Sequence, residues 1–424
     1  MLTSYRTTLQ QASRNIRLML LLSFLMGLTI DGGIFGVIFN LYVLRMDFGP
    51  EFVGQVNSAA QFMFAIGSFG AGAMSGIAGR AGIRRGMVLG QWLILVGAIL
   101  VPCSDLMPDA WKAVCVMSGM LFIYLGLAIY YTNSGPFLML HAGPEARSSL
   151  VAMQAALAGV ASLIGGLVGG FLPGIVHELT GVALSEPGPY RLPLTLVAVS
   201  AGAAVATVLA TRDDPDGIAA DGTLPADEPT GAPPATSAYG LIALLALIRF
   251  LQVGAVAVAS TFFNVYMDAG LGASTTTIGL WSAAARVIAV PAALIGPSIS
   301  RRIGFGKTSI WASLGATVSV LPMAFFPTPE AVGLGYVGLM TCTLIRYPAF
   351  FVYLMDKTPE RLRAATNGAG EMAAGLSFAL VALVGGYIIA GPGYPLTFLL
   401  GAGMTLAGTV VFWFFLRAKG DITG

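Results

Sequence analysis

Long apolar runs separated by short polar stretches dominate the sequence. A membrane-spanning helix needs about 20 mostly apolar residues, and twelve runs in this chain come close to that length or exceed it. We expect spans at 17–43, 52–74, 87–102, 112–139, 149–174, 190–210, 239–265, 275–298, 308–326, 332–355, 367–390 and 395–416. The pattern therefore predicts an all-α membrane protein that crosses the bilayer twelve times.

One connection between these runs is much longer than the others. Residues 212–237 are acidic, rich in Pro, Gly and Ala, and lack an apolar period, which is typical of a disordered linker. This stretch separates six predicted spans from six. We therefore expect a cytoplasmic segment over 1–16, a six-helix bundle over 17–211, the cytoplasmic linker over 212–237, a second six-helix bundle over 238–417 and a cytoplasmic tail over 418–424.

The placement of lysine and arginine predicts the orientation, because cytoplasmic loops carry an excess of both. With the N-terminus in the cytoplasm, sixteen of these residues lie on the cytoplasmic side, three on the outer side and three inside spans. We therefore expect both termini in the cytoplasm, in a multi-pass protein of the cell membrane (the inner membrane in a bacterium). The first apolar run is far longer than the roughly 7–15-residue core of a cleavable signal, so we interpret it as an uncleaved span.

Composition agrees with a membrane protein and argues against several function classes. Of the 424 residues, 56% are hydrophobic and 10% charged, whereas about 25% are charged in a soluble domain; mean hydropathy is +0.82. The net charge of +2, without a basic patch interleaved with aromatics, argues against nucleic-acid binding. Cys103, Cys115 and Cys342 lack metal-ligand spacing, and no HExxH, GxSxG or Walker motif occurs. We therefore expect no enzyme activity, no cofactor and no bound metal.

Five charged residues inside the predicted spans are the strongest functional signal. They are Asp31, Arg249, Arg286, Arg346 and Glu371. A charge in hydrocarbon costs about 2.5–3.5 kcal/mol on insertion scales, and it persists where it faces a water-filled cavity or a partner. These residues therefore predict a polar pathway through the membrane.

Asp31 is the first candidate for proton coupling, and Glu371 is the second. Gly27, Gly32 and Gly33 flank Asp31 and leave room for water or a ligand. A desolvated carboxylate can carry a proton near neutral pH, so Asp31 could exchange protons during transport. The alternative is a structural salt bridge between Asp31 and an arginine of the other half.

The intramembrane arginines indicate an anionic or amphiphilic substrate. Arg286 and Arg346 are expected to contact it, because a guanidinium binds two carboxylate or phosphate oxygens at once. Three arginines against two acids leave a formal excess of +1. The alternative is a fully paired internal network that gates the two halves. Further candidates for the substrate cavity are polar residues of the second and fourth spans: Asn57, Gln61, Tyr130, Tyr131 and Asn133.

A second group of charges is expected to gate the pathway or to play structural roles. Arg249 and Glu371 lie in the cytoplasmic half of their spans, where they form a candidate inner gate or structural pair. The others stand at cytoplasmic helix ends, where charges interact with the helix dipole and can also pair between the halves. These are Arg80, Arg84, Arg85, Glu145, Arg147, Arg301, Arg302, Glu360 and Arg361.

The two halves of the sequence resemble each other. FNLY at 39–42 ends the first predicted span, and FNVY at 263–266 ends the seventh. The glycine pair at 169–170 in the fifth span matches the pair at 385–386 in the eleventh. Such matches in the same order favour duplication of a six-span unit, with the copies related by a pseudo-two-fold axis along the membrane normal.

The loop after the second span and a glycine-rich stretch carry a family resemblance. SGIAGRAGIRR at 75–85 is similar to the motif G-x-L-A-D-R-x-G-R-K, with Arg80 and the basic tail present and Gly79 in place of the aspartate. The loop at 297–307 is a looser copy. On this loop and its topology, the chain resembles the major facilitator superfamily. GGLVGG at 165–170 resembles the antiporter motif of the family's exporters without its proline, although glycines four apart also let helices pack closely.

The resemblance implies a secondary transporter in which two six-helix bundles rock about a midplane cavity. We expect it to move a small organic solute by alternating access, coupled to protons or another ion, as a monomer in the lipid bilayer. Export of an amphiphilic or anionic compound is favoured over import, because the spans are apolar and aromatic. The alternatives are a gradient-driven uniporter or importer, and a ligand- or lipid-binding membrane receptor that transports nothing.

Overall fold

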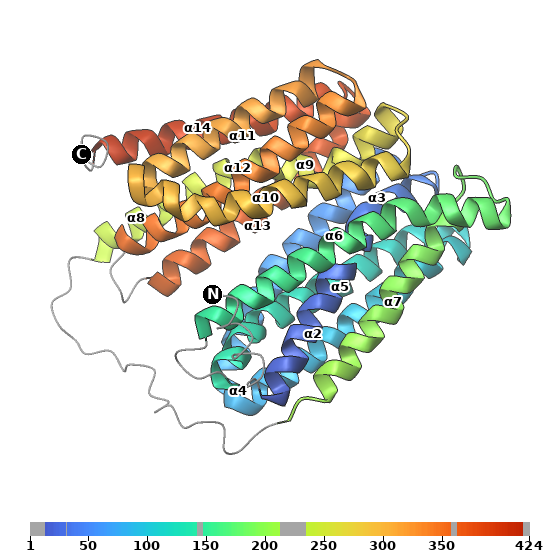
Figure 1. Cartoon of the computed structure of the whole chain (residues 1–424), viewed down its shortest axis with the longest axis horizontal. Coiled ribbons are helices and arrows are strands. Elements are labelled where there is room, and N and C mark those ends of the chain that lie inside the picture. The colour runs from blue at the N-terminus through green and yellow to red at the C-terminus, as the bar shows by residue number, and fades with distance from the viewer. Residues whose placement is uncertain (1–12, 31, 142–146, 213–234, 358–362, 419–424) are drawn as a thin grey trace. The chain divides into compact units, whose positions relative to one another are not determined.

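Helices make up all the regular structure in the described part of the chain (Figure 1). The computed structural model describes residues 13–30, 32–141, 147–212, 235–357 and 363–418. The first half contains α2 (Arg14–Thr29), α3 (Ile34–Leu44), α4 (Pro50–Cys103), the short η1 (Ser104–Leu106), α5 (Asp109–His141), α6 (Arg147–Thr180) and α7 (Gly188–Leu209). The second half contains α8 (Ala235–Gln252), α9 (Gly254–Val265), the π-helical η2 (Tyr266–Gly270), α10 (Thr275–Ile303), α11 (Phe305–Phe325), α12 (Pro329–Lys357), α13 (Arg363–Ala390) and α14 (Tyr394–Ala418).

Within the described residues, ten helical segments are long and apolar enough to cross a membrane. They are Arg14–Leu44, Gly82–Leu106, Asp109–Ser134, Leu157–Thr180, Gly188–Leu209, Gly240–Gly270, Phe305–Phe325, Pro329–Leu354, Ala369–Ala390 and Tyr394–Ala418. The remaining two predicted runs, 52–74 and 275–298, lie in α4 and α10. The chain is a multi-pass membrane protein, as the apolar runs predicted.

Helix α4 differs from the expectation of two spans joined by a loop. Its helical backbone continues from Pro50 to Cys103 and includes the stretch between the runs 52–74 and 87–102. The sequence has no proline between Pro50 and Pro102. Proline is the residue that most strongly interrupts helical hydrogen bonding, so the backbone can remain helical through this polar stretch.

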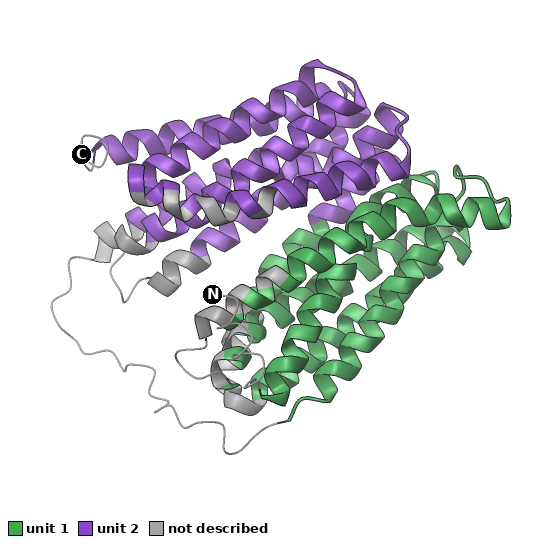
Figure 2. Ribbon diagram, in the orientation of Figure 1, with its two compact units in different colours: residues 1–48, 59–222 green, residues 49–58, 223–424 purple. Residues whose placement is uncertain are grey.

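The helices form two compact units (Figure 2). Unit 1 consists of residues 1–48 and 59–222, and unit 2 of residues 49–58 and 223–424. In unit 1, α2 and α3 both pack against α6 and α7. In unit 2, α12 packs against α10 and α11, and α14 packs against α8, α9 and α11.

The start of α4 packs with unit 2 through a close contact with α13. A Cβ atom on Gly54 would lie 2.4 Å from the carbonyl oxygen of Ala382. One residue later, Gln55 Nε2 donates a hydrogen bond of 2.8 Å to the Tyr387 hydroxyl. The missing side chain of Gly54 therefore allows this contact, which a larger residue would prevent.

The span that opens each half is broken. The segment Arg14–Leu44 is interrupted after Thr29, and Gly32 there has a φ of +76°, a conformation that glycine adopts without strain. The segment Gly240–Gly270 is interrupted between Gln252 and Gly254. Broken helices at membrane depth are tolerated where the freed backbone groups are buried in protein and find other partners.

Small residues of α6 pack against the first break. A Cβ atom on Gly165 would lie 1.8 Å from the Leu28 carbonyl oxygen, and one on Gly169 would lie 3.2 Å from Ile34 Cα. On the opposing helix, a Cβ atom on Gly27 would lie 2.4 Å from the Ala158 carbonyl oxygen. The expectation of close helix packing is confirmed for Gly165 and Gly169, the two glycines of the 165–170 stretch whose contacts are described here.

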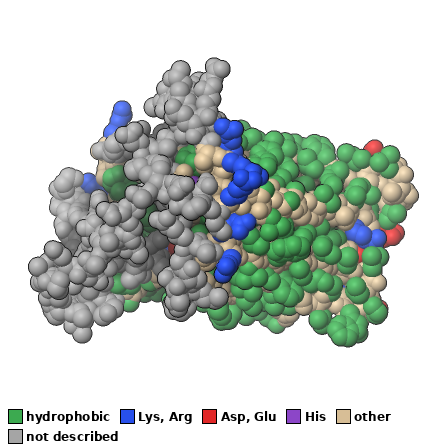
Figure 3. All heavy atoms as spheres, turned by 90° about the horizontal axis from the view of Figure 1, so that it is seen from below, with side chains coloured by type: hydrophobic (Ala, Val, Ile, Leu, Met, Phe, Trp, Pro, Cys, Tyr) green, Lys and Arg blue, Asp and Glu red, His purple; other side chains and the backbone are tan. Residues whose placement is uncertain are grey.

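A large hydrophobic surface faces outward. Figure 3 shows hydrophobic side chains (green) over a broad area, with Lys and Arg side chains (blue) gathered in a band along one edge of it. Val199, Trp311 and Phe414 are among the exposed apolar side chains. Soluble monomers rarely expose large contiguous apolar patches, whereas a bilayer requires them.

Candidate functional site

The second helix break lies at the centre of a set of buried polar contacts in unit 2. Thr405 of α14 bridges the break: its hydroxyl accepts from the Ala255 backbone N–H at 2.9 Å and donates to the Gln252 carbonyl at 3.3 Å. Gly254 brings the helices together, because a Cβ atom there would lie 2.6 Å from Met404 Cβ. Thr405 thereby satisfies backbone groups that the interrupted helix leaves free.

Arg346 of α12 contacts the residue that precedes the break. It is the largest fully buried side chain of the described residues, with 1% of its surface exposed, and its Nη1 donates to Gln252 Oε1 at 3.3 Å. Among the described residues, Arg346 Nε and Gln252 Nε2 have no hydrogen-bond partner, although both atoms are buried. A buried donor without an acceptor is costly, so the pair offers two N–H donors to an incoming acceptor.

A second arginine lies one helical turn before Gln252. The Arg249 guanidinium lies 4.7 Å from the ring centroid of Tyr347, and its Nη2 is 3.6 Å from Glu371 Oε1. The Tyr347 hydroxyl donates to the same Glu371 oxygen at 3.3 Å. The structure thus brings Arg249 and Glu371 together, with Tyr347 in contact with both. The Glu371 side chain is 51% exposed, so the surrounding helices of the described structure do not enclose it.

Arg249, Gln252, Arg346, Tyr347 and Glu371 form a polar cluster with an excess of positive charge. The cluster contains the two guanidinium groups of Arg249 and Arg346, and Glu371 supplies one negative charge beside Arg249. Arginine binds carboxylate and phosphate groups through parallel N–H···O bonds. Arg346, which has an N–H donor that no described residue accepts, therefore has the chemistry to bind an anionic group, while Glu371 lies beside Arg249.

Comparison with known proteins identifies the family. The model of the Major Facilitator Superfamily matches residues 19–369 and, in a second match, residues 245–422. The chain belongs to the major facilitator superfamily. The resemblance found in the sequence is thereby confirmed. A comparison with curated proteins gave no match.

Solved structures of this superfamily share the fold. The crystal structure of a D-xylose–proton symporter has a TM-score of 0.74 at 16% identity and covers 94% of this chain and 97% of its own. The nucleoside transporter NupG has a TM-score of 0.69 at 14% identity, with 95% and 98% covered. The inward-open xylose transporter XylE from E. coli has a TM-score of 0.70 at 15% identity, with 94% and 96% covered. The chain therefore has a transporter fold of the major facilitator superfamily.

The other candidates for the substrate cavity are found on α10 and α4. Arg286 lies on α10, where its Nη1 donates to the Ser282 carbonyl at 3.4 Å. Asn57, in the part of α4 that belongs to unit 2, donates through Nδ2 to the Val53 carbonyl at 2.8 Å. Gln61, one turn later, is half-buried. Asp31 lies outside the described residues.

The candidates of the fourth span pack against α4 in unit 1. Asn133 is buried and donates to the Ile129 carbonyl at 2.8 Å, and a Cβ atom on Gly86 would lie 2.8 Å from Asn133 Nδ2. Tyr130 is buried, whereas its neighbour Tyr131 is exposed. Asn133 and Tyr130 therefore lie between helices, and only Tyr131 presents a large exposed surface.

The charges at helix ends are described in part. Arg84 joins α4 to the end of α7, because it donates from Nε to Thr211 Oγ1 and from Nη2 to the Leu209 carbonyl, each at 3.2 Å. Arg85 and Arg302 are exposed. The remaining candidates, or their side chains, lie outside the described residues: Arg80, Glu145, Arg147, Arg301, Glu360 and Arg361.

Sequence reasoning missed Gln252 and Thr405. Gln252 lies three residues after Arg249, a spacing that places both on one helix face, so the polar pair could have been recognised within an apolar span. Thr405 offers no such signal, because a threonine in a transmembrane helix commonly bonds only to its own backbone.

No group of three or more His, Cys, Asp or Glu suited to hold a metal occurs in the part of the chain that the structure describes.

Proposed function

We propose that this protein is a secondary transporter that moves a small organic solute with an anionic group across the membrane by alternating access. The observation that carries this proposal is the buried Arg346, whose Nε–H lacks an acceptor among the described residues, beside the equally unpaired Gln252 Nε2. Family membership supplies the transport class, and the arginine site supplies the substrate chemistry.

The position of this site supports a role in substrate binding. Gln252 lies near the middle of the span Gly240–Gly270 and directly before its break. Arg346 lies about 26 Å along α12 at 1.5 Å per residue, well inside the span Pro329–Leu354. A buried charge with an unsatisfied donor is expensive, and an anion that reaches it would recover part of that cost.

We further propose the complete architecture expected from the sequence. It consists of twelve spans in two six-helix bundles related by a pseudo-two-fold axis, with both termini in the cytoplasm. The breaks after Thr29 and after Gln252, each in the first span of its half, support duplication of a six-span unit. The excess of lysine and arginine on one side supports the orientation.

Proton coupling is the second part of the proposal. Asp31 remains the first candidate for the proton carrier from its place in the sequence, and Glu371 is the second. Glu371 has one feature that suits the role: its contacts with Arg249 and Tyr347 are long, at 3.6 and 3.3 Å, so protonation could release Arg249. We propose export over import on the apolar character of the spans alone.

Transport assays in proteoliposomes test both parts. The full chain is reconstituted around a pH-sensitive dye, and carboxylates, phosphate esters, sugars and lipophilic cations are added as separate pools. We expect flux with an anionic pool, at least partial retention in Arg346→Lys, and loss in Arg346→Gln. Arg417→Gln, an exposed arginine at the end of α14, is the control that keeps wild-type flux.

The outcomes separate the alternatives. Flux of sugars or cations only, unchanged in Arg346→Gln, would refute the anion site. Anion flux with proton movement that is lost in Asp31→Asn would assign coupling to Asp31, and loss in Glu371→Gln alone would assign it to Glu371. Binding of an anion without flux would favour the receptor alternative.

A further inference from the structure

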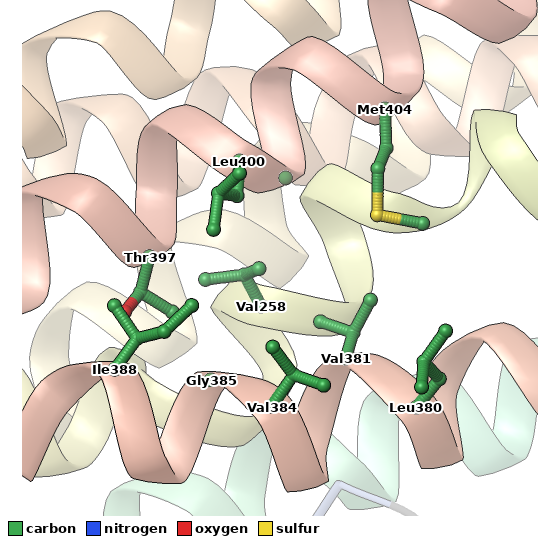
Figure 4. Close-up of a pocket in the computed structure, with 10 residues that line it drawn as sticks. Val258, Leu380, Val381, Val384, Gly385, Ile388, Thr397, Leu400 and Met404 are labelled. Atoms are coloured by element: carbon green, nitrogen blue, oxygen red, sulfur yellow. The ribbon is translucent and has the colours of Figure 1, made fainter.

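An apolar crevice opens on the surface of unit 2 between α9, α13 and α14 (Figure 4). It has a volume of about 160 Å³. Leu380 and Val384 of α13 line it from one side and Leu400 of α14 from the other, while Val258 of α9 closes its inner end. The first three side chains are 48%, 43% and 45% exposed and form the mouth, whereas Val258 is 2% exposed.

The crevice offers no free hydrogen-bond donor to a ligand. Thr397 is its one residue with a polar side chain, and the Thr397 hydroxyl donates to the Gly393 carbonyl at 3.4 Å. The remaining lining consists of aliphatic side chains, Met404 and two glycines. Burial of a polar or charged group here would cost several kcal/mol without a partner, so the lining accepts hydrocarbon only.

The long axis of the crevice runs along the helices that line it, and therefore along the acyl chains of the surrounding lipid. Its lining on α13 extends from Leu380 to Ile388, which is about 12 Å along the helix axis at 1.5 Å per residue. Both α13 and α14 have the length and hydropathy of membrane spans, so the long dimension of the crevice follows the chain direction of the surrounding lipid. Leu400 lies about 9 Å along α14 from Tyr394 by the same rise, at the depth of the upper acyl chain.

We propose that this crevice binds one acyl chain of a membrane phospholipid. The lipid belongs to the leaflet that contains the α13–α14 connection, which is the outer leaflet in the orientation predicted from lysine and arginine. An apolar cavity of about 150 Å³ in another protein stays dry and binds benzene, so a volume of this size suits a stretch of hydrocarbon. Its selectivity over bulk lipid comes from packing against preformed walls.

A bound chain would contact the helix pair that holds the second break. Met404, at one end of the crevice (Figure 4), packs against Gly254, the first residue of α9, and precedes Thr405. The occupied crevice therefore stabilises the contact between α9 and α14 at the break. This inference concerns lipid binding and does not depend on which solute is transported.

Photolabelling tests the proposal in the full chain. The protein is reconstituted in phosphatidylglycerol–phosphatidylethanolamine vesicles that contain a small fraction of phospholipid with a diazirine in the middle of one acyl chain. After irradiation, labelled positions are mapped by peptide mass spectrometry. We expect labelling of Leu400 and Met404 several-fold above that of Leu406 and Val410, which are also exposed on α14 but do not line the crevice.

Matched variants connect the labelling to the crevice. Val384→Trp closes the mouth and should reduce labelling of Met404 several-fold, whereas Leu383→Trp, one residue away and 36% exposed, should not. Leu400→Trp closes the mouth from α14 and serves as the second variant if Val384→Trp does not fold. Uniform labelling of all exposed side chains on α13 and α14 would overturn the proposal, because it means ordinary solvation by lipid. Disulfide-linked dimers of Val384→Cys would also overturn it, because a second copy would then cover the crevice.

Discussion

Replacing Thr405 by valine tests whether one hydroxyl holds the break between α8 and α9. The substitution preserves the branched shape and removes the hydroxyl that bonds to the backbone on both sides of the break. Thr405 Oγ1 accepts from the Ala255 N–H at 2.9 Å and donates to the Gln252 carbonyl at 3.3 Å. Valine can make neither bond, and Ala255 is buried, so its N–H loses this acceptor in a place with little access to water.

The size of the effect follows from these two bonds. Side-chain hydrogen bonds between membrane helices contribute about 0.6 kcal/mol on average, with a maximum of about 1.7. A buried donor left without an acceptor costs about 1–3 kcal/mol. We therefore expect Thr405→Val to lower the free energy of unfolding by about 2 kcal/mol, which shifts the midpoint by about 4–8 °C for a unit of 150–250 residues.

Thermal unfolding of purified protein in detergent measures this shift, and Thr409→Val is the matched control. Thr409 lies one turn later on α14, is equally buried, and donates at 2.7 Å only to the Thr405 carbonyl of its own helix. That carbonyl lies within the α14 helix and so has a backbone partner as well, and we expect a loss below about 0.5 kcal/mol. Equal destabilisation by both substitutions, or none by either, would refute the assignment of the break to Thr405.

Two further predictions concern unit 1. Gly165→Leu should prevent α6 from approaching α2, because even a Cβ atom would lie 1.8 Å from a backbone oxygen. Size-exclusion chromatography of this variant should show loss of folded protein. The control is Gly174→Leu, which should remain monodisperse because nothing lies within 4 Å of its Cβ position. Arg191→Gln should lower the unfolding free energy by about 1–3 kcal/mol, because it leaves the Asp105 carboxylate, 2% exposed, without its cation. Lys112→Gln, which removes a pair with a 94% exposed partner, should cost below about 1 kcal/mol in the same thermal assay.

The spans could be predicted from sequence because the bilayer restricts the alternatives. A chain segment in hydrocarbon must satisfy its own backbone hydrogen bonds, so a long apolar run becomes a helix. The run at 17–43 therefore located the span Arg14–Leu44, and the family resemblance followed from the loop at 75–85 and the topology. The continuous helix of α4 was missed because polar residues and glycines resemble a loop, although without proline they do not force the helix to end.

The tertiary contacts could not be predicted because their partners are far apart in sequence. The Arg346–Gln252 bond joins residues separated by 94 positions, and the Ala255–Thr405 bond joins residues separated by 150. Gly254 could not be recognised from the sequence as the site of a break, because the chain has 55 glycines and most of them lie within regular helices. What distinguishes Gly254 is its close contact with α14. The place of residues 49–58 in unit 2 could not be predicted either, because it depends on glycine contacts with α13, which is distant in the sequence.

The two helix breaks are supported by different chemistry, and this difference bears on function. In unit 1, the described residues around the break are held by direct backbone contact, since Gly165 allows α6 to approach Leu28. In unit 2, a threonine hydroxyl bridges the break, and Gln252 beside it carries a buried amide that contacts Arg346. The two breaks thus occur at similar places in the two halves of the sequence but are held by different groups. The anion site that we propose lies beside the polar break, whereas Asp31 falls at the other break in the sequence, so substrate recognition and proton coupling would be divided between the two units.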